Sequence, residues 1–124
     1  MATLKFTQEE ANDIIFNALC DGMAFIRGYD CFIHCDKFQY DVAREKFETP
    51  TIEDVYMEVL KSGNKLIWVD VESMEETKVD LLTMTERLNL VDFDVISNFI
   101  SEQYDAEDAD IVLQTIFLGE VRFA

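Results

Sequence analysis

Residues 51–82 read TIEDVYMEVLKSGNKLIWVDVESMEETKVDLL and contain the signals of a helix followed by a strand. Thr51, with Asp54 three residues later, forms a capping box, and apolar residues then recur at helical spacing until Gly63. Residues 66–71 are rich in β-branched and aromatic side chains that alternate as in a half-buried strand. This stretch therefore combines the two periodicities of a mixed fold.

Strand signals occur in pairs. Polar residues 73–76 predict a turn that leads into a returning strand over 77–82. Residues 23–27 and 31–35 are expected to form a second hairpin around Gly28, because a glycine-containing connection separates two short apolar runs. Short edge strands are expected near the two ends of the chain, at Leu4 to Phe6 and at Val121 to Phe123. The sheet should therefore be small and mainly antiparallel.

Helix signals flank these strands. Capping residues predict helices that begin after Thr7, Asp36, Thr83, Asp92 and Asp105. The first is expected over residues 8–21, with Gly22 as its stop, and the last should end at Gly119. Helices and hairpins are interspersed without a strict strand–helix–strand rhythm. The sequence predicts a compact single α+β domain over residues 1–124, with a small mainly antiparallel sheet packed with four to six helices.

The composition excludes several classes of protein. The 124 residues are 49% apolar, which is enough to bury a core, and 26 Asp and Glu against 10 Lys and Arg give a net charge of −16. Such a surface repels phosphate backbones and anionic lipids, so neither direct nucleic-acid binding nor membrane binding is expected. We find no apolar run of signal-peptide or membrane-span length, and the three cysteines are an odd number. We therefore expect a cytoplasmic protein without a disulfide framework.

The negative charge is concentrated in one part of the sequence. No Lys or Arg occurs between Arg87 and Arg122. The apolar stripes of the helices expected there point inward, so most of the carboxylates should project to solvent. The predicted partner-binding surface consists of Asp92, Asp94, Glu102, Asp105, Glu107, Asp108 and Asp110. The charge could equally serve local stability, since several of these residues start helices, where anions are stabilising by about 0.3–1 kcal/mol each, or it could serve solubility alone.

The charge favours a non-enzymatic binding protein that docks on a basic partner surface. A finer form of this hypothesis is imitation of DNA, because carboxylates four residues apart on a helix lie about 6 Å apart, near the spacing of phosphates along one strand. In size and charge the chain resembles the small acidic inhibitors that bacteriophages use against restriction or CRISPR enzymes. That resemblance rests on chain length and net charge alone, since no residue motif accompanies it. It implies an inhibitor of a nucleic-acid-binding protein.

The alternative is a small enzyme or metal-binding module. Asp70, Glu72 and Asp80 could converge on Mg²⁺ or Ca²⁺ if the hairpin places them on one face. A second candidate centre is the Cys31, His34 and Cys35 cluster, with Cys20 as a fourth zinc ligand. If residues 31–35 are a strand, Cys31 and Cys35 would lie about 13 Å apart, which argues against zinc. A cleft with converging carboxylates would favour this alternative over the binding protein.

Most catalytic motifs are missing. The four glycines stand alone, so a phosphate-binding loop cannot be built, and His34 is the only histidine for a triad or a metal site. Residues 105–116 begin like a calcium loop but have Asp110 where glycine is required and Ile116 where glutamate is required. We therefore expect no cofactor, no bound metal and no enzymatic activity.

Overall fold

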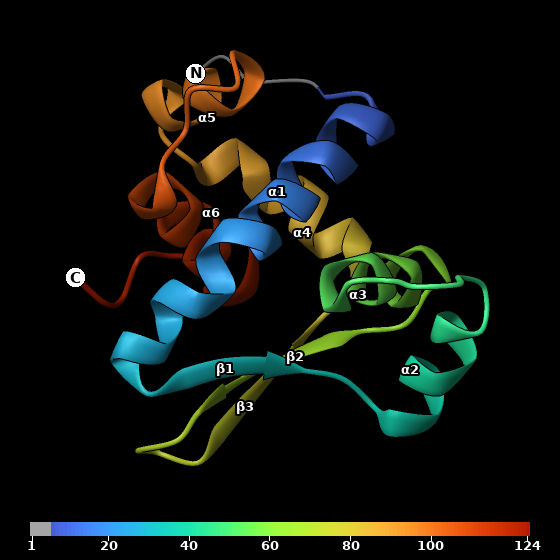
Figure 1. The fold of residues 1–124 in the computed structure, drawn as a ribbon. Helices are drawn as coiled ribbons and strands as arrows, with labels where there is room; N and C mark the ends of the chain where they lie inside the picture. The colour runs from blue at the N-terminus through green and yellow to red at the C-terminus, as the bar shows by residue number, and fades with distance from the viewer. Residues whose placement is uncertain (1–5) are drawn as a thin grey trace.

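The computed structural model describes residues 6–124 and shows six α-helices, two 3-10 helices and three strands in that range (Figure 1). In chain order they are α1 Gln8–Ile26, η1 Arg27–Tyr29, β1 Cys31–His34, α2 Lys37–Arg44, α3 Ile52–Lys61, β2 Leu66–Asp70, β3 Glu75–Val79, α4 Leu81–Arg87, η2 Leu88–Leu90, α5 Phe93–Ile100 and α6 Ala106–Leu118. The expected α+β class with a small antiparallel sheet is confirmed.

The sheet has the order β1-β2-β3, and both pairings are antiparallel. Ile33 pairs with Trp68, and Trp68 pairs with Thr77, so the three side chains point to the same face. Trp68 is 2% exposed and lies against Phe117 of α6, with ring centroids 5.7 Å apart. In Figure 1 the sheet lies along the bottom of the view, and α1, α3 and α6 lie above it. Helices therefore cover one face of the sheet.

Helix α6 is the centre of the core. Its residues from Val112 to Phe117 are all buried, and it contacts α1, α4, α5 and β3. Two polar side chains lie within that run. Thr115 donates from Oγ1 to the Ile111 carbonyl at 2.8 Å, and Gln114 holds the C-terminal segment. Buried polar groups in α6 are thus satisfied by hydrogen bonds, as a low-dielectric interior requires.

The N-terminal helix is longer than the sequence predicts. α1 passes through Gly22 to Ile26, so residues 23–27 are not a strand, and β1 pairs with β2 instead of with them. Gly22 is not a stop because it lies at the contact with α6: a Cβ there would be 2.5 Å from Leu113 Cδ1. The apolar stripe continues to the fully buried Ile26. Close packing of two helices explains this glycine.

The β2–β3 hairpin is also shifted from its expected position. β3 begins at Glu75 and ends at Val79, whereas the sequence predicted a strand over 77–82. Asp80 caps α4 by accepting a hydrogen bond from Thr83 N at 2.9 Å. Thr83 is therefore the third residue of that helix rather than its cap. β3 therefore ends at Val79, because the next residue, Asp80, already caps α4.

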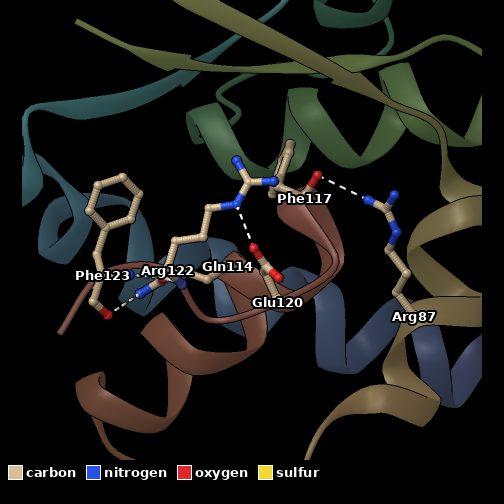
Figure 2. A network of polar contacts seen from close by, with 6 residues as sticks. All are labelled: Arg87, Gln114, Phe117, Glu120, Arg122 and Phe123. Atoms are coloured by element: carbon tan, nitrogen blue, oxygen red, sulfur yellow. Dashed lines mark hydrogen bonds and ion pairs between the residues drawn. The ribbon is translucent and has the colours of Figure 1, made fainter. Parts of the chain in front are cut away.

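The C-terminal segment is held by side chains instead of by strand pairing (Figure 2). Gln114 Oε1 accepts hydrogen bonds from the backbone N–H groups of Arg122 and Phe123 at 2.7 and 2.8 Å, and its Nε2 donates to the Phe123 carbonyl at 3.1 Å. The Phe123 ring stacks on Tyr29 with centroids 5.1 Å apart. The edge strand expected at residues 121–123 is therefore wrong. Phe6 is likewise outside any strand, and Leu4 lies outside the described residues.

Candidate functional site

The seven carboxylates predicted to bind a partner differ in burial and in structural role. Five of them are exposed, Asp108 is half-buried and Asp110 is buried. The exposed ones are Asp92, Asp94, Glu102, Asp105 and Glu107. The seven therefore do not make one uniform binding surface, and each must be placed by its contacts.

Asp110 was predicted to belong to the exposed partner-binding surface, but the structure buries it. Its side chain is 4% exposed and accepts hydrogen bonds from the Tyr29 hydroxyl at 2.7 Å and from Gln114 Nε2 at 3.0 Å. Burial, followed by the Asp110 hydrogen bond, raises the pKa of Tyr29 to about 12. The prediction assumed that α6 exposes its polar positions. Because α6 is enclosed on most of its sides, Asp110 instead links the core to the C-terminal segment.

Asp105 and Asp108 have structural roles at the start of α6. Asp105 Oδ1 accepts from Asp108 N at 2.8 Å, and Asp108 Oδ2 accepts from Asp105 N at 3.3 Å, which completes a capping box. Asp108 also accepts a hydrogen bond from Asn98 Nδ2 at 3.0 Å, which joins α6 to α5. Local stability explains part of the charge at these two positions.

Two adjoining hollows lie between α1 and the connection from α5 to α6. The first, of about 400 Å³, is lined by Asn17, Asp21, Glu102, Tyr104, Asp105 and Ala106. The second, of about 360 Å³, is lined by Glu10, Asp13, Ile14, Asn17, Phe99, Ile100 and Glu102. They share Asn17 and Glu102, so we treat them as one surface and call it the acidic groove. Glu102 and Asp105 are the only two of the seven predicted residues in its lining.

One side of the acidic groove comes from the exposed face of α1. Asp13, Asn17 and Asp21 are spaced four residues apart, so they lie along one face of the helix. The apolar stripe that includes Ile15 and Leu19 faces the core instead. The sequence interpretation missed Glu10, Asp13 and Asp21 because it searched for one contiguous stretch without cations. Their helical spacing was the signal that could have found them.

The other side comes from a tight turn after α5. Glu102 N donates to the Phe99 carbonyl at 3.2 Å, and Gln103 N donates to the Asn98 carbonyl at 2.8 Å, which is the Schellman pattern of helix termination. Glu102 has a φ of 59°, in the left-handed region that usually selects glycine. The Tyr104 ring then stacks on Phe99 with centroids 4.2 Å apart. This turn places the Glu102 carboxylate where the two hollows meet.

The groove has carboxylates that no cation of the described residues matches. Its lining contains five acidic side chains and, among the described residues, no Lys, Arg or His. The four ion pairs found in residues 6–124 all lie elsewhere and are His34–Glu76, Lys37–Asp41, Lys46–Glu58 and Arg122–Glu120. Burial, followed by the neighbouring Asp21 carboxylate, raises the pKa of Tyr104 to about 12. Within residues 6–124, the groove is therefore a region of concentrated negative charge that has no ion-pair partner.

Nearby cations are committed to other contacts. Arg87 Nη1 donates to the Ile116 carbonyl at 3.2 Å and to the Phe117 carbonyl at 2.9 Å, and so caps the C-terminal end of α6. Figure 2 shows the second of these hydrogen bonds. Arg122 Nε donates to Glu120 Oε1 at 3.1 Å in the same region. A cation at a helix C-terminus complements the helix dipole. These two arginines, which border the basic-free stretch of sequence, therefore do not neutralise the groove.

The carboxylates of the alternative site do not converge. Asp70 lies at the turn end of β2, where it pairs with Glu75 and its Oδ1 accepts from Glu72 N at 3.0 Å. Asp80 lies at the opposite end of the hairpin, after the pairing of Leu66 with Val79, and caps α4. The hairpin therefore does not bring Asp70, Glu72 and Asp80 together, as the metal-site alternative requires.

The thiol cluster is dispersed as well. Cys31 is buried, whereas His34 points to Glu76 with 3.9 Å between Nε2 and Oε1. Burial is the main cause that raises the pKa of both Cys20 and Cys35 to about 11, so their reactive thiolate form is scarce near neutral pH. Within residues 6–124, no three His, Cys, Asp or Glu side chains are grouped so that they could hold a metal ion. The groove carboxylates thus surround a hollow without forming a metal centre in the described part of the chain.

Two further findings do not concern the groove. None of the helices in the described residues combines the length and the apolar character needed to cross a membrane. No protein-family model, curated protein or solved structure matches this chain.

Proposed function

We propose that this chain is a non-enzymatic binding protein that docks its acidic groove on a basic surface of a partner protein. The observation that carries the proposal is the set of five carboxylates around one hollowed surface whose described lining contains no cation. Charge of one sign in a concave surface attracts ligands of the opposite sign and accelerates their association. A basic protein surface fits this charge, whereas nucleic acids and anionic lipids do not.

Local stability does not account for the charge at every groove position. Glu102 has left-handed backbone geometry and directly follows the C-terminal end of α5, where the helix dipole favours cations over anions. Asp13 and Glu102 have no side-chain hydrogen bond or ion pair among residues 6–124. Like charges brought close together also oppose folding. Partner binding supplies a reason for keeping these carboxylates.

Imitation of DNA is the finer form of the proposal. The net charge of −16 supports it, and three groove carboxylates, Glu10, Asp13 and Asp21, come from one helix, α1. In this form the partner surface is a nucleic-acid channel, and the chain is an inhibitor of the kind that bacteriophages use against defence enzymes. The cationic residues that normally hold phosphates would then hold the groove carboxylates.

A capture experiment tests the docking proposal. The immobilised chain is incubated with a lysate of its source cells at low and at high salt, beside a groove variant with Asp13→Asn, Asp21→Asn and Glu102→Gln. The control variant, Glu45→Gln, Glu48→Gln and Glu72→Gln, has the same change in charge at exposed positions outside the groove. We expect a partner that binds the native chain and the control variant at low salt and elutes at high salt. Equal capture by the groove variant would contradict the proposal.

A competition experiment tests the finer form. The captured partner is mixed with labelled duplex DNA, and increasing amounts of the chain are added. Displacement of the DNA by the native chain, and not by the groove variant, is expected if both occupy one site. A complex that holds DNA and the chain together would exclude imitation of DNA and leave docking on a different basic surface.

A further inference from the structure

Helix α5 has an apolar face that no described part of the chain covers. Phe93 is 65% exposed and Ile100 is 64% exposed. The two residues are seven positions apart, which is close to two full turns, so they lie on the same face of the helix. Val95, Ile96 and Phe99 form the adjoining part of the helix surface and are buried in the core. Large apolar side chains exposed on one face of a helix are a common feature of protein-binding sites.

This apolar face joins the acidic groove. Ile100 is exposed and also belongs to the groove lining, together with Ile14 and Phe99. Glu10 and Asp13 on α1 and Glu102 after α5 line the same hollow. One continuous surface therefore offers an apolar strip beside carboxylates. A ligand that only carried positive charge would leave the apolar strip in water.

We infer that the acidic groove and the apolar face of α5 together bind an amphipathic basic helix of a partner protein. The inference rests on the proposed function and adds the chemical class of the ligand. Such a helix has Arg or Lys on one side and apolar residues on the adjoining side, which matches the order of carboxylates and apolar side chains across this surface. Burying Phe93 and Ile100 supplies the hydrophobic contribution, and the groove supplies the orientation.

The hollow around Tyr104 suits an arginine side chain of that helix. Asp21, Glu102 and Asp105 line this hollow of about 400 Å³ with Tyr104 among them. A guanidinium group pairs with carboxylates through two parallel hydrogen bonds and also packs well on aromatic rings. We therefore expect arginine to bind more tightly than lysine at this end of the groove. The Ile100 end should accept leucine-like side chains.

Three labelled peptides of about 18 residues, or roughly five helical turns, test the inference. The first places Arg and Leu on separate faces of a helix, the second has the same composition in scrambled order, and the third replaces Leu by Ala. Binding is measured by fluorescence anisotropy for the native chain and for the double variant Phe93→Ser and Ile100→Ser. The control variant, Phe38→Ser and Val42→Ser, removes two exposed apolar side chains from α2, outside both hollows.

The expected result is selective binding of the segregated peptide. The segregated peptide should bind the native chain at least about tenfold more tightly than either of the other two peptides does, which corresponds to about 1.4 kcal/mol. The control variant should show the same preference. The Phe93 and Ile100 variant should lose about the same factor. Amide chemical shifts of α5, of the exposed face of α1 and of residues 101–106 should change on binding. Unfolding curves of each variant show whether it is folded, and the single variant Ile100→Ser replaces the double variant if it is not.

Other outcomes overturn the inference without deciding the proposed function. Equal binding of all three peptides, or unchanged binding by the Phe93 and Ile100 variant, would show that charge alone attracts the ligand. Failure of every peptide to bind the native chain would also overturn it. The capture experiment with the Asp13, Asp21 and Glu102 variant tests docking separately, because it needs no assumption about a helical ligand.

Discussion

Gly22 lies where α1 crosses α6, and its missing side chain allows the two helices to approach each other. A Cβ at this position would be 2.5 Å from Leu113 Cδ1 and 3.2 Å from the Ala109 carbonyl oxygen. Glycine inside a helix normally costs about 1 kcal/mol relative to alanine. The close contact in the core outweighs that propensity here.

Gly22→Ala should therefore destabilise the protein, although alanine is the better helix former. We expect the free energy of unfolding to fall by about 1–3 kcal/mol, the usual cost of adding a methyl group to a filled core. Gly28→Ala is the control, because a Cβ at Gly28 would have no atom within 4 Å. Urea unfolding of the two variants measures the difference. A Gly22→Ala variant as stable as the native chain would show that α1 and α6 can separate without cost.

Glu102 is the residue at which stability and binding should oppose each other. Glycine fits the left-handed backbone at φ 59° without steric cost, so Glu102→Gly should raise the free energy of unfolding by about 0.5–1 kcal/mol. The same change removes a groove carboxylate and should weaken partner capture. Glu102→Gln should also weaken capture, but it should not raise the free energy of unfolding, because glutamine does not relieve the left-handed backbone. If Glu102→Gly destabilised the chain, the Glu102 side chain would have a structural role that the described contacts do not contain.

Among the helices, the starts were predictable from the sequence except at α4, where Asp80 and not Thr83 is the cap, and the ends were less so. The capping boxes of Thr7 and Thr51 begin α1 and α3 as expected, because a cap depends on residues three positions apart. Gly119 ends α6 in the left-handed conformation, again as expected. Gly22 does not end α1, because only the contact with Leu113 on a distant element explains that glycine. Local signals are reliable where the stabilising interaction is itself local.

The two N-caps of α5 and α6 provide a matched comparison. Asp105 accepts a hydrogen bond from Asp108 N, whereas the Asp92 side chain makes no capping hydrogen bond. Asp105→Ala should lower the free energy of unfolding by about 1 kcal/mol, and Asp92→Ala should have a smaller effect. Chemical denaturation of the two variants measures this difference. Equal losses would mean that Asp92 stabilises α5 by its charge as much as Asp105 does by its hydrogen bond.

The groove could not be derived from the sequence as a whole, because it joins segments that are far apart in the chain. The acidic, basic-free stretch contains Glu102 and Asp105, which line the groove. Asp13 and Asp21 come from α1 and reach the same hollows only through the packing of α1 against α6. Burial of Asp110 could not be predicted for the same reason, since several elements enclose α6 beyond its first turn and bury Asp110 as well as the apolar residues. The fold class followed from periodicity, whereas the site depends on tertiary contacts.

Added salt should affect folding and binding in opposite directions. The chain has a net charge of −16, and screening weakens the repulsion among its carboxylates, so the melting temperature should rise between about 0.05 and 0.5 M NaCl. Partner binding should weaken over the same range, because the attraction between opposite charges is screened as well. Calorimetry and the capture assay measure the two effects on one sample series. Binding that persists at high salt would indicate an interface dominated by apolar contacts.

High pH should destabilise the fold through its tyrosines. Burial is the main cause that raises the pKa of Tyr29, Tyr56 and Tyr104 to about 12, above the ordinary value of 10.0. The folded state holds these protons more tightly than the unfolded state, so stability is unaffected below about pH 10 and falls as the pH rises towards 12. The urea midpoint, measured beside tyrosinate absorbance, should show this decline. Tyr104→Phe should make the decline shallower, and an unchanged slope would exclude a contribution from this tyrosine.

The contact at Gly22 also controls the dimensions of the proposed binding surface. Asp21 precedes this glycine and lines the groove, and Ala106, one turn before Ala109 on α6, lines it from the other side. A larger side chain beneath this crossing would spread the two helices and open the hollow above them. Substitutions in the interior, with no contact to any ligand, would then change which basic proteins the chain prefers. Selectivity could therefore evolve from inside the molecule while every carboxylate at its surface stays the same.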